Sequence, residues 1–263
     1  MKAHILSGVL VLPAILLASA LAIGTAMTQD SQSPSLPTVQ QVMDRYVVAL
    51  GGRDAILKHN SMTIREKLEV SDKVKLDRVV YFKDGKSHEE IVLPDGGRYE
   101  SGYDGKVAWE ENPGTGPTLI QGDEAKSKAR DADMHYPARV LDYFSSLAVV
   151  DIAPFEGHTC YHLKGTNAWG KINEQFYDVT TGLLAGYRFN SAWRGGAGDE
   201  SAVFTDYRDF GGWKIPTRIE HKEPKRTLTE VVDSVTFDDV ADTVVSLPDA
   251  VKALVKKEHG SGA

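Results

Sequence analysis

The stretch 61-SMTIREKLEVSDKVKLDRVVYFKDGKSHEEIVLPDGGRYESGYDGKVAWEEN-112 decides the fold. Its first half alternates apolar and polar residues, as expected when one face of a β-strand is buried. The apolar positions are Met62, Ile64, Leu68 and Val70 in one run, with Glu66 breaking the series, and Leu76, Val80 and Phe82 in the next. Asp-Gly pairs at 84–85, 95–96 and 104–105 are typical of tight turns. Since parallel strands need longer crossovers, such short turns indicate an antiparallel meander.

The same kind of pattern continues outward from this stretch along most of the chain. Turn signals at Thr180–Gly182 and Gly211–Gly212 separate later runs in the same way. Further candidate strands cover 87–93, 98–103, 106–111, 117–121, 148–155, 158–165, 171–178, 183–190, 200–210, 213–222 and 227–238.

Helical spacing appears in fewer places. The clearest case precedes the first strand, where Thr38 can cap a helix that Gly51 and Gly52 end. Its apolar stripe consists of Val39, Val42, Met43, Tyr46, Val47 and Leu50. A charged helix is predicted over 123–131, a second apolar one over 136–147, and a small one over 248–257.

An amphipathic helix must cover an apolar surface, and a long twisted sheet curls instead of staying flat. The sequence therefore predicts an α+β fold, mainly antiparallel β. We expect a curved, incomplete (half-open) β-barrel of about eleven strands with helices on the concave side. A complete barrel and a two-sheet sandwich are the alternatives.

The amino-terminal residues indicate export. Lys2 is followed by an almost wholly apolar run, Ile5 to Ala22, and then by small residues up to Ala26. This order is that of a secretory signal peptide, although a retained membrane anchor of similar length is the alternative. We predict a signal peptide at 1–26, a linker at 27–37, a single domain at 38–245, and a carboxy-terminal helix and tail at 246–263. No other membrane segment is expected, and the mature protein should be periplasmic.

Composition excludes some classes of partner. The net charge is −7 and no basic stripe occurs, which argues against nucleic acid. Cys160 is the only cysteine, so no internal disulfide can form and stability must come from an apolar core.

The sharpest candidate for chemistry is His158-Thr159-Cys160-Tyr161-His162. On a strand, His158, Cys160 and His162 share one face, and imidazole and thiolate suit zinc or copper. If the opposite face is buried, the same three residues point outward and hold nothing. The sequence nominates no further ligand and no nucleophile elbow, so we expect no metal, no cofactor and no catalytic residues.

Several segments resemble exported bacterial proteins of the outer-membrane lipoprotein-sorting (LolA-like) superfamily. They are Tyr103–Gly114, Gly122–Ala125, Arg130–Asp133, Asp178–Leu184, Phe204–Ile219 and the helix end Ala49–Gly52, and together the resemblance spans about 38–240. These are turn and strand motifs. The resemblance implies an unclosed barrel of about eleven strands wrapped on a helical lid, with an apolar cavity for acyl chains or other lipids.

We therefore expect a non-catalytic periplasmic carrier or chaperone for a lipid, an acyl chain or a lipoprotein. Six residues are predicted to meet around its cavity: Val42, Met43, Tyr46, Phe82, Trp109 and Phe144. Two alternatives remain open. One is a module that binds another envelope protein without lipid cargo, and the other is a metal-dependent enzyme that uses the His158/Cys160/His162 strand.

Overall fold

The computed structural model describes residues 35–71, 74–190, 198–224 and 226–260, with side chains as far as residue 258. The predicted signal peptide and residues 27–34 of the predicted linker lie outside this part. Leu36–Ala263 form one compact unit. Among the described helices, none is long and apolar enough to cross a membrane.

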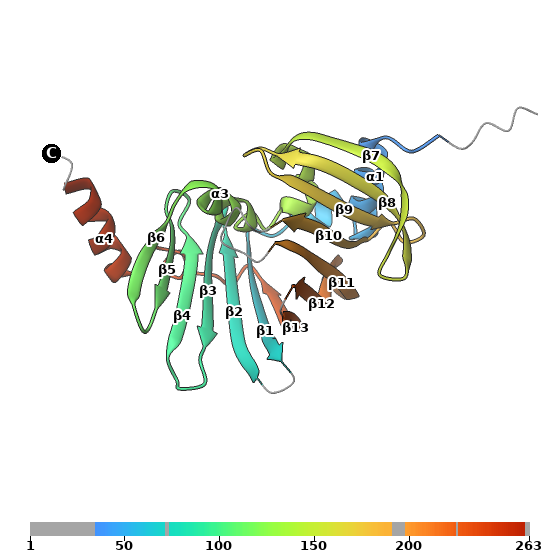
Figure 1. Cartoon of the computed structure of the whole chain (residues 1–263). Helices are drawn as coiled ribbons and strands as arrows, with labels where there is room; N and C mark the ends of the chain where they lie inside the picture. Colours follow the sequence, from blue (N-terminus) through green and yellow to red (C-terminus); the bar gives the residue numbers. More distant parts are fainter. Residues whose placement is uncertain (1–34, 72–73, 191–197, 225, 261–263) are drawn as a thin grey trace, which may run out of the picture. The chain divides into compact units, whose positions relative to one another are not determined.

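The described strands form one sheet in which every pairing is antiparallel. Their order is β6-β5-β4-β3-β2-β1-β13-β12-β11-β10-β9-β8-β7 (Figure 1). The bounds are β1 Ser61–Ser71, β2 Val74–Lys83, β3 Lys86–Val92, β4 Arg98–Tyr103, β5 Ala108–Asn112, β6 Gly116–Ile120, β7 Phe144–Phe155, β8 His158–Asn167, β9 Ile172–Asp178, β10 Leu184–Asn190, β11 Asp199–Phe210, β12 Trp213–Glu223 and β13 Arg226–Phe237.

The mainly antiparallel α+β class is confirmed. Strands β6 and β7 end the order without pairing to each other, so the sheet is open across the described residues. It holds thirteen described strands, and the expectation of about eleven is wrong. Two short strands, β5 and β6, extend one edge because turns at Gly105 and Gly116, both at positive φ, let the chain reverse twice.

Six helical segments accompany the sheet in the described part of the chain. They are α1 Val39–Ala49, α2 Arg53–Leu57, α3 Gly122–Asp131, the 3₁₀ turns η1 Tyr136–Ala138 and η2 Val140–Tyr143, and α4 Asp249–Gly260. The predicted helix over 136–147 is wrong. Its last four residues, from Phe144 onward, belong to β7 and pair with β8, because the spacing of its apolar residues suits two short turns followed by a strand equally well.

Helix α1 is fixed at both ends. Thr38 caps it. Its Oγ1 accepts a hydrogen bond from the backbone N–H of Gln41, and the Gln41 side-chain Oε1 accepts one from the backbone N–H of Thr38. At the other end, the backbone N–H of Lys214 donates to the Leu50 carbonyl at 2.8 Å. Gly51 has φ 115°, and a Cβ there would lie 1.8 Å from the Gly212 carbonyl oxygen. Only glycine permits this approach of α1 to the β11–β12 turn.

The main core lies on one face of the sheet, which we call the inner face. By register it carries Met62 of β1, Phe82 of β2, Leu163 of β8 and Tyr177 of β9. Buried Val42, Met43, Tyr46 and Leu50 of the α1 segment pack into the same cluster. The partly buried residues against it include Tyr136, Phe144, Tyr161, Tyr207 and Val235.

The opposite, outer face holds a second, smaller cluster of Phe155, Cys160, Phe176, Ala185 and Val203. Phe155 stacks on Phe176 with ring centroids 4.3 Å apart. Trp109 is also on the outer face, over Gly102 and with its ring 5.4 Å from that of His88. Helix α4 packs against β6 at the edge of the sheet (Figure 1). Both faces of the sheet therefore bury large side chains.

Candidate functional site

A cavity of about 520 Å³ lies on the inner face. Its floor consists of side chains from β9–β13, and its roof comes from α1, α3 and the 3₁₀ turns. The floor includes Asn173, Gln175, Tyr177, Leu184, Tyr187, Phe189, Phe204, Tyr207, Ile219, His221 and Glu230. The roof includes Tyr46, Ser127, Arg130, Asp131, Asp133, Tyr136, Pro137 and Val140. The volume is within the range typical of small-molecule sites.

Four tyrosines of this lining form what we call the tyrosine cluster: Tyr46, Tyr136, Tyr177 and Tyr207. Tyr177 donates a hydrogen bond to Gln175 Oε1 at 2.9 Å, and Gln175 Nε2 donates to the Tyr136 hydroxyl at 3.4 Å. Tyr207 donates to the Leu184 carbonyl at 2.8 Å. Burial raises the pKa of all four hydroxyls, so they are neutral donors at physiological pH.

A group of buried charges adjoins the cavity at Glu230. This Arg78 network comprises Arg78, Glu66, Glu89 and Glu230. Arg78 Nη1 contacts Glu66 and lies 2.9 Å from Glu230 Oε1, and Arg78 Nε lies 2.9 Å from Glu89 Oε1. The Arg78 side chain is 18% exposed and that of Glu66 only 4%. Three carboxylates thus surround one guanidinium that little solvent reaches.

This crowding shifts the pKa values of Glu66 and Glu230 in opposite directions. Burial, together with the nearby carboxylates Glu230 and Glu89, raises the pKa of Glu66 to about 7 despite Arg78. Glu230 is also buried, but Arg78 and the His221 side chain at 3.1 Å lower its pKa to about 2. Lys128 of α3 adds a second positive charge near the three carboxylates. Its Nζ donates to Ser101 Oγ at 2.8 Å and lies 3.7 Å from Glu89.

The ionisable groups of the roof are paired within the fold. Arg130 binds Asp131 through Nε at 2.8 Å and Nη2 at 2.6 Å, and its guanidinium lies over the rings of Tyr136 and Trp169. Asp133 accepts a hydrogen bond from the Tyr143 hydroxyl at 2.8 Å. These pairs fix the position of the roof segments.

The structure brings five of the six predicted site residues into one apolar cluster. Val42, Met43 and Tyr46 are buried in it, and Phe82 and Phe144 pack against it. Tyr46 lines the cavity, and Phe82 lines a smaller adjoining space of about 200 Å³. Trp109 lies apart on the outer face. Whether any of the six contacts a ligand stays a prediction.

Sequence reasoning missed most of the cavity floor. Gln175 and Tyr177 come from β9, Tyr207 from β11 and Glu230 from β13, and their proximity follows from the strand order. One signal was present. Glu66 interrupts an apolar face. A charged side chain at such a position is either exposed to solvent or buried in an ion pair.

The strand from His158 to His162 turns its apolar face inward. Tyr161 and Leu163 join the main core, so the histidines face outward. His158 Nδ1 lies 2.9 Å from Asp178, and His162 stacks on Phe176 with Nδ1 3.1 Å from Asp151. Burial raises the pKa of the Cys160 thiol to about 11. Among the described residues, no group of three or more His, Cys, Asp or Glu could hold a metal ion.

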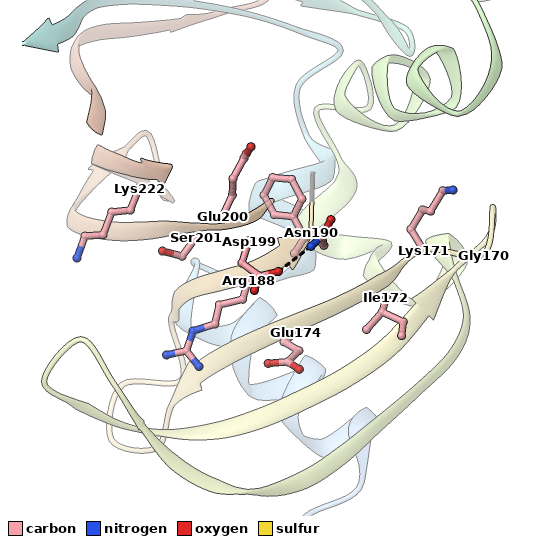
Figure 2. A pocket seen from close by; sticks show the side chains of 11 residues that line it. Gly170, Lys171, Ile172, Glu174, Arg188, Asn190, Asp199, Glu200, Ser201 and Lys222 are labelled. Atoms are coloured by element: carbon pink, nitrogen blue, oxygen red, sulfur yellow. Dashed lines mark hydrogen bonds between the residues drawn. The ribbon is translucent and has the colours of Figure 1, made fainter. Parts of the chain in front are cut away.

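A second hollow, of about 680 Å³, opens at the ends of β9–β11. Figure 2 shows its charged side chains spread over separate strands, with Lys222 and Lys171 on opposite sides and the Asn190–Asp199 hydrogen bond between them. Lys171 reaches Asp123 at 3.1 Å. The lining includes residues on both sides of 191–197, which lie outside the described residues, so we assign no site there.

Solved structures of other proteins share this arrangement. A LolA superfamily protein from Nitrosomonas europaea matches with a TM-score of 0.55 at 12% identity, covering 81% of this chain and 99% of its own. The chain has the LolA-like fold. A DUF1329 family protein from Desulfovibrio piger gives 0.55 at 15% identity over 79% and 97% of the two chains. A putative outer membrane lipoprotein-sorting protein domain from Vibrio parahaemolyticus gives 0.51 at 12% identity over 82% and 96%.

The likeness is one of structure. No protein-family model and no curated protein matches the sequence. With identities this low, the LolA-like fold of the chain is established and its ligand is not.

Proposed function

We propose that this LolA-like chain is an exported carrier that binds a lipid, an acyl chain or the acyl part of a lipoprotein in the inner cavity. The inner face would be the concave side of an incomplete barrel, and α1 and α3 would be its helical cover. The observation that carries the proposal is the cavity of about 520 Å³ between an aromatic floor and this cover.

The energetics favour an apolar chain in this space. Aromatic and aliphatic side chains such as Phe189, Phe204 and Ile219 line the floor. Each methylene group moved from water into such a lining contributes about 0.8 kcal/mol. A long acyl chain therefore gains several kcal/mol even after the entropy cost of binding.

The ionic groups around the cavity support binding over catalysis. Arg130, Asp133 and Glu230 are each held by a partner inside the protein. A general acid or base must instead reach a substrate atom directly. We infer that these groups hold the cavity in shape and that the ligand leaves unchanged.

The test is binding of a pyrene-labelled hexadecanoic acid, followed by fluorescence. Ile219→Trp places a larger side chain on the cavity floor and should reduce binding at least tenfold, while the protein stays folded. Val48→Trp is the matched control, since Val48 is 73% exposed on α1 and the added ring stays in solvent. Equal binding by wild type and Ile219→Trp, or none by wild type, would contradict the proposal.

A second candidate is docking of another envelope protein along β7. This strand ends the sheet on one side, and its Val150 and Ile152 are 42% and 50% exposed. A partner strand could pair with such an edge. Native mass spectrometry of protein isolated from its own cells separates the two candidates, because the carrier retains a lipid and the docking module retains a polypeptide.

We also propose that residues 1–26 are removed on export and that the mature chain is periplasmic. Amino-terminal sequencing of exported protein should begin near residue 27. A sequence that starts at Met1 would instead indicate a retained anchor.

A further inference from the structure

Tyr46 is a buried donor that the fold leaves without an acceptor. The residue is 6% exposed and lines the cavity from α1. Within the described part of the chain its hydroxyl makes no hydrogen bond, whereas the hydroxyls of Tyr177 and Tyr207 both donate to oxygens of the fold. The hydroxyl oxygen is not one of the fully enclosed side-chain atoms that lack a partner, so it opens on the cavity, where a bound group can accept its hydrogen.

Tyr136 supplies a second donor of the same kind. Its hydroxyl accepts a hydrogen bond from Gln175 Nε2 at 3.4 Å, and no described group accepts its own hydrogen. It lines the same cavity from η1, and it is close enough to Tyr46 to raise the pKa of that residue. Both residues thus line one cavity from the roof, and no described group accepts a hydrogen bond from either hydroxyl.

A group that accepts hydrogen bonds would satisfy both hydroxyls. We propose that the cavity recognises the carbonyl oxygen of an acyl ester or amide, which receives hydrogen bonds from Tyr46 and Tyr136 while the acyl chain lies on the aromatic floor. This rests on the proposed carrier function and specifies what part of the ligand is recognised.

A neutral acceptor fits this position better than a carboxylate. The same burial that raises the pKa of the tyrosines disfavours any charge placed beside them. The nearest roof cation, Arg130, is already engaged by two hydrogen bonds to Asp131. A free carboxylate would therefore be buried without a free counter-charge, whereas an uncharged ester or amide carbonyl exchanges its hydrogen bonds to water for those from Tyr46 and Tyr136.

The experiment compares two fluorescent ligands of equal length. One is the methyl ester of a pyrene-labelled hexadecanoic acid, and the other is a pyrene-labelled alkane with no carbonyl group. Wild type should bind the ester more tightly. Tyr46→Phe and Tyr136→Phe should each weaken ester binding about three- to tenfold, the range of one hydrogen bond, and leave alkane binding unchanged. Tyr103→Phe is the control, since its hydroxyl donates to the Gly105 carbonyl in an exposed turn.

Thermal unfolding without ligand provides the second readout. Tyr46→Phe removes an unpartnered hydroxyl and nothing else, so its melting temperature should equal or exceed that of wild type. If wild type binds both ligands and Tyr46→Phe binds the ester equally well, the carbonyl inference is overturned and the carrier function stands. If wild type binds neither ligand, both are overturned.

Discussion

The tyrosine cluster and the Arg78 network lie on the same inner face, yet they handle buried polarity in opposite ways. In the network, each carboxylate contacts Arg78, and the charges are satisfied inside the protein. In the cluster, Tyr177 and Tyr207 donate within the fold, while no group in the described part of the chain accepts a hydrogen bond from Tyr46 or Tyr136. An unpaired hydroxyl costs about 1–3 kcal/mol, but an unpaired buried charge costs far more. Only the hydroxyls can therefore be left free for a ligand.

Removing the central charge should give the largest effect. Arg78→Met leaves Glu66, Glu89 and Glu230 without their shared partner, so we expect a loss of about 3–5 kcal/mol at pH 8. Urea unfolding measures it. Arg98→Met is the matched control, because Arg98 is 60% exposed in its pair with Glu90 and should cost at most about 1 kcal/mol. Similar losses in both variants would show that the network contributes no more than a surface pair.

The second effect tests how tightly the tyrosine side is packed. Met43 is 5% exposed and lines neither inner space, so Met43→Trp overfills a packed region. We expect a loss of about 1–3 kcal/mol in unfolding free energy, with ligand binding retained by the folded fraction. If the variant keeps full stability and loses binding of the pyrene-labelled acid, the cavity extends beneath α1 as far as Met43.

The pH dependence of stability gives a smaller effect with a defined sign. The folded protein holds the Glu66 proton up to about pH 7, whereas the ordinary pKa is 4.5. Glu66 therefore lowers wild-type stability as pH rises from about 4.5 to 7. Glu66→Gln cannot titrate and should gain on wild type across this window, by about 1–2 kcal/mol.

Glu230→Gln is the comparison variant, for which the opposite pH dependence of stability is expected. The pKa of Glu230 is about 2, so its contribution is complete above pH 4.5 and disappears as pH falls toward 2. This variant should lose stability at neutral pH and approach wild type in acid. Chemical unfolding at pH 3, 5 and 8 measures both variants, and equal pH profiles would exclude the separated titration of the two carboxylates.

The smallest effect concerns the cover of the tyrosine cluster. Thr38→Ala removes the side-chain cap of α1 and should cost about 1 kcal/mol, measured by thermal unfolding. Thr118→Ala is a control in an exposed strand position, where the hydroxyl contacts Glu110. A larger loss from Thr118→Ala would show that the amino-terminal end of α1 contributes little to the fold.

The strands were predictable from the sequence because alternation and Asp-Gly turns are local signals. All thirteen segments proposed as strands pair in the sheet, so the expected count of about eleven was lower than the number of strands that the pattern itself indicated. Local signals fail where both faces of the sheet are covered. Trp109 is a large aromatic residue on an alternating strand, so the alternation alone does not tell which face it occupies. Gly102 on the neighbouring strand leaves space for its ring on the outer face.

The cavity depends on non-local information. Glu66 signals a buried pair, but its partner Arg78 also binds Glu230 of β13, which is far from both residues in sequence. The four tyrosines line one cavity because β9 and β11 lie close together in the sheet and α1 and η1 cover them. No residue spacing within a single segment indicates this. Val42, Met43 and Tyr46, three of the six predicted site residues, share the core because helical periodicity and burial coincide in α1.

The attachment of α1 holds the hydroxyl of Tyr46 in a fixed position in the cavity wall. Its carboxy-terminal end is held through Leu50 and Gly51 against the β11–β12 turn, and Arg45 donates to the Val179 carbonyl at 2.8 Å. Helix α3 buries only Ser127. Tyr46 therefore belongs to a part of the cavity wall that is attached through the backbone, whereas α3 is attached through side chains, by Lys128 to Ser101 and by Lys171 to Asp123.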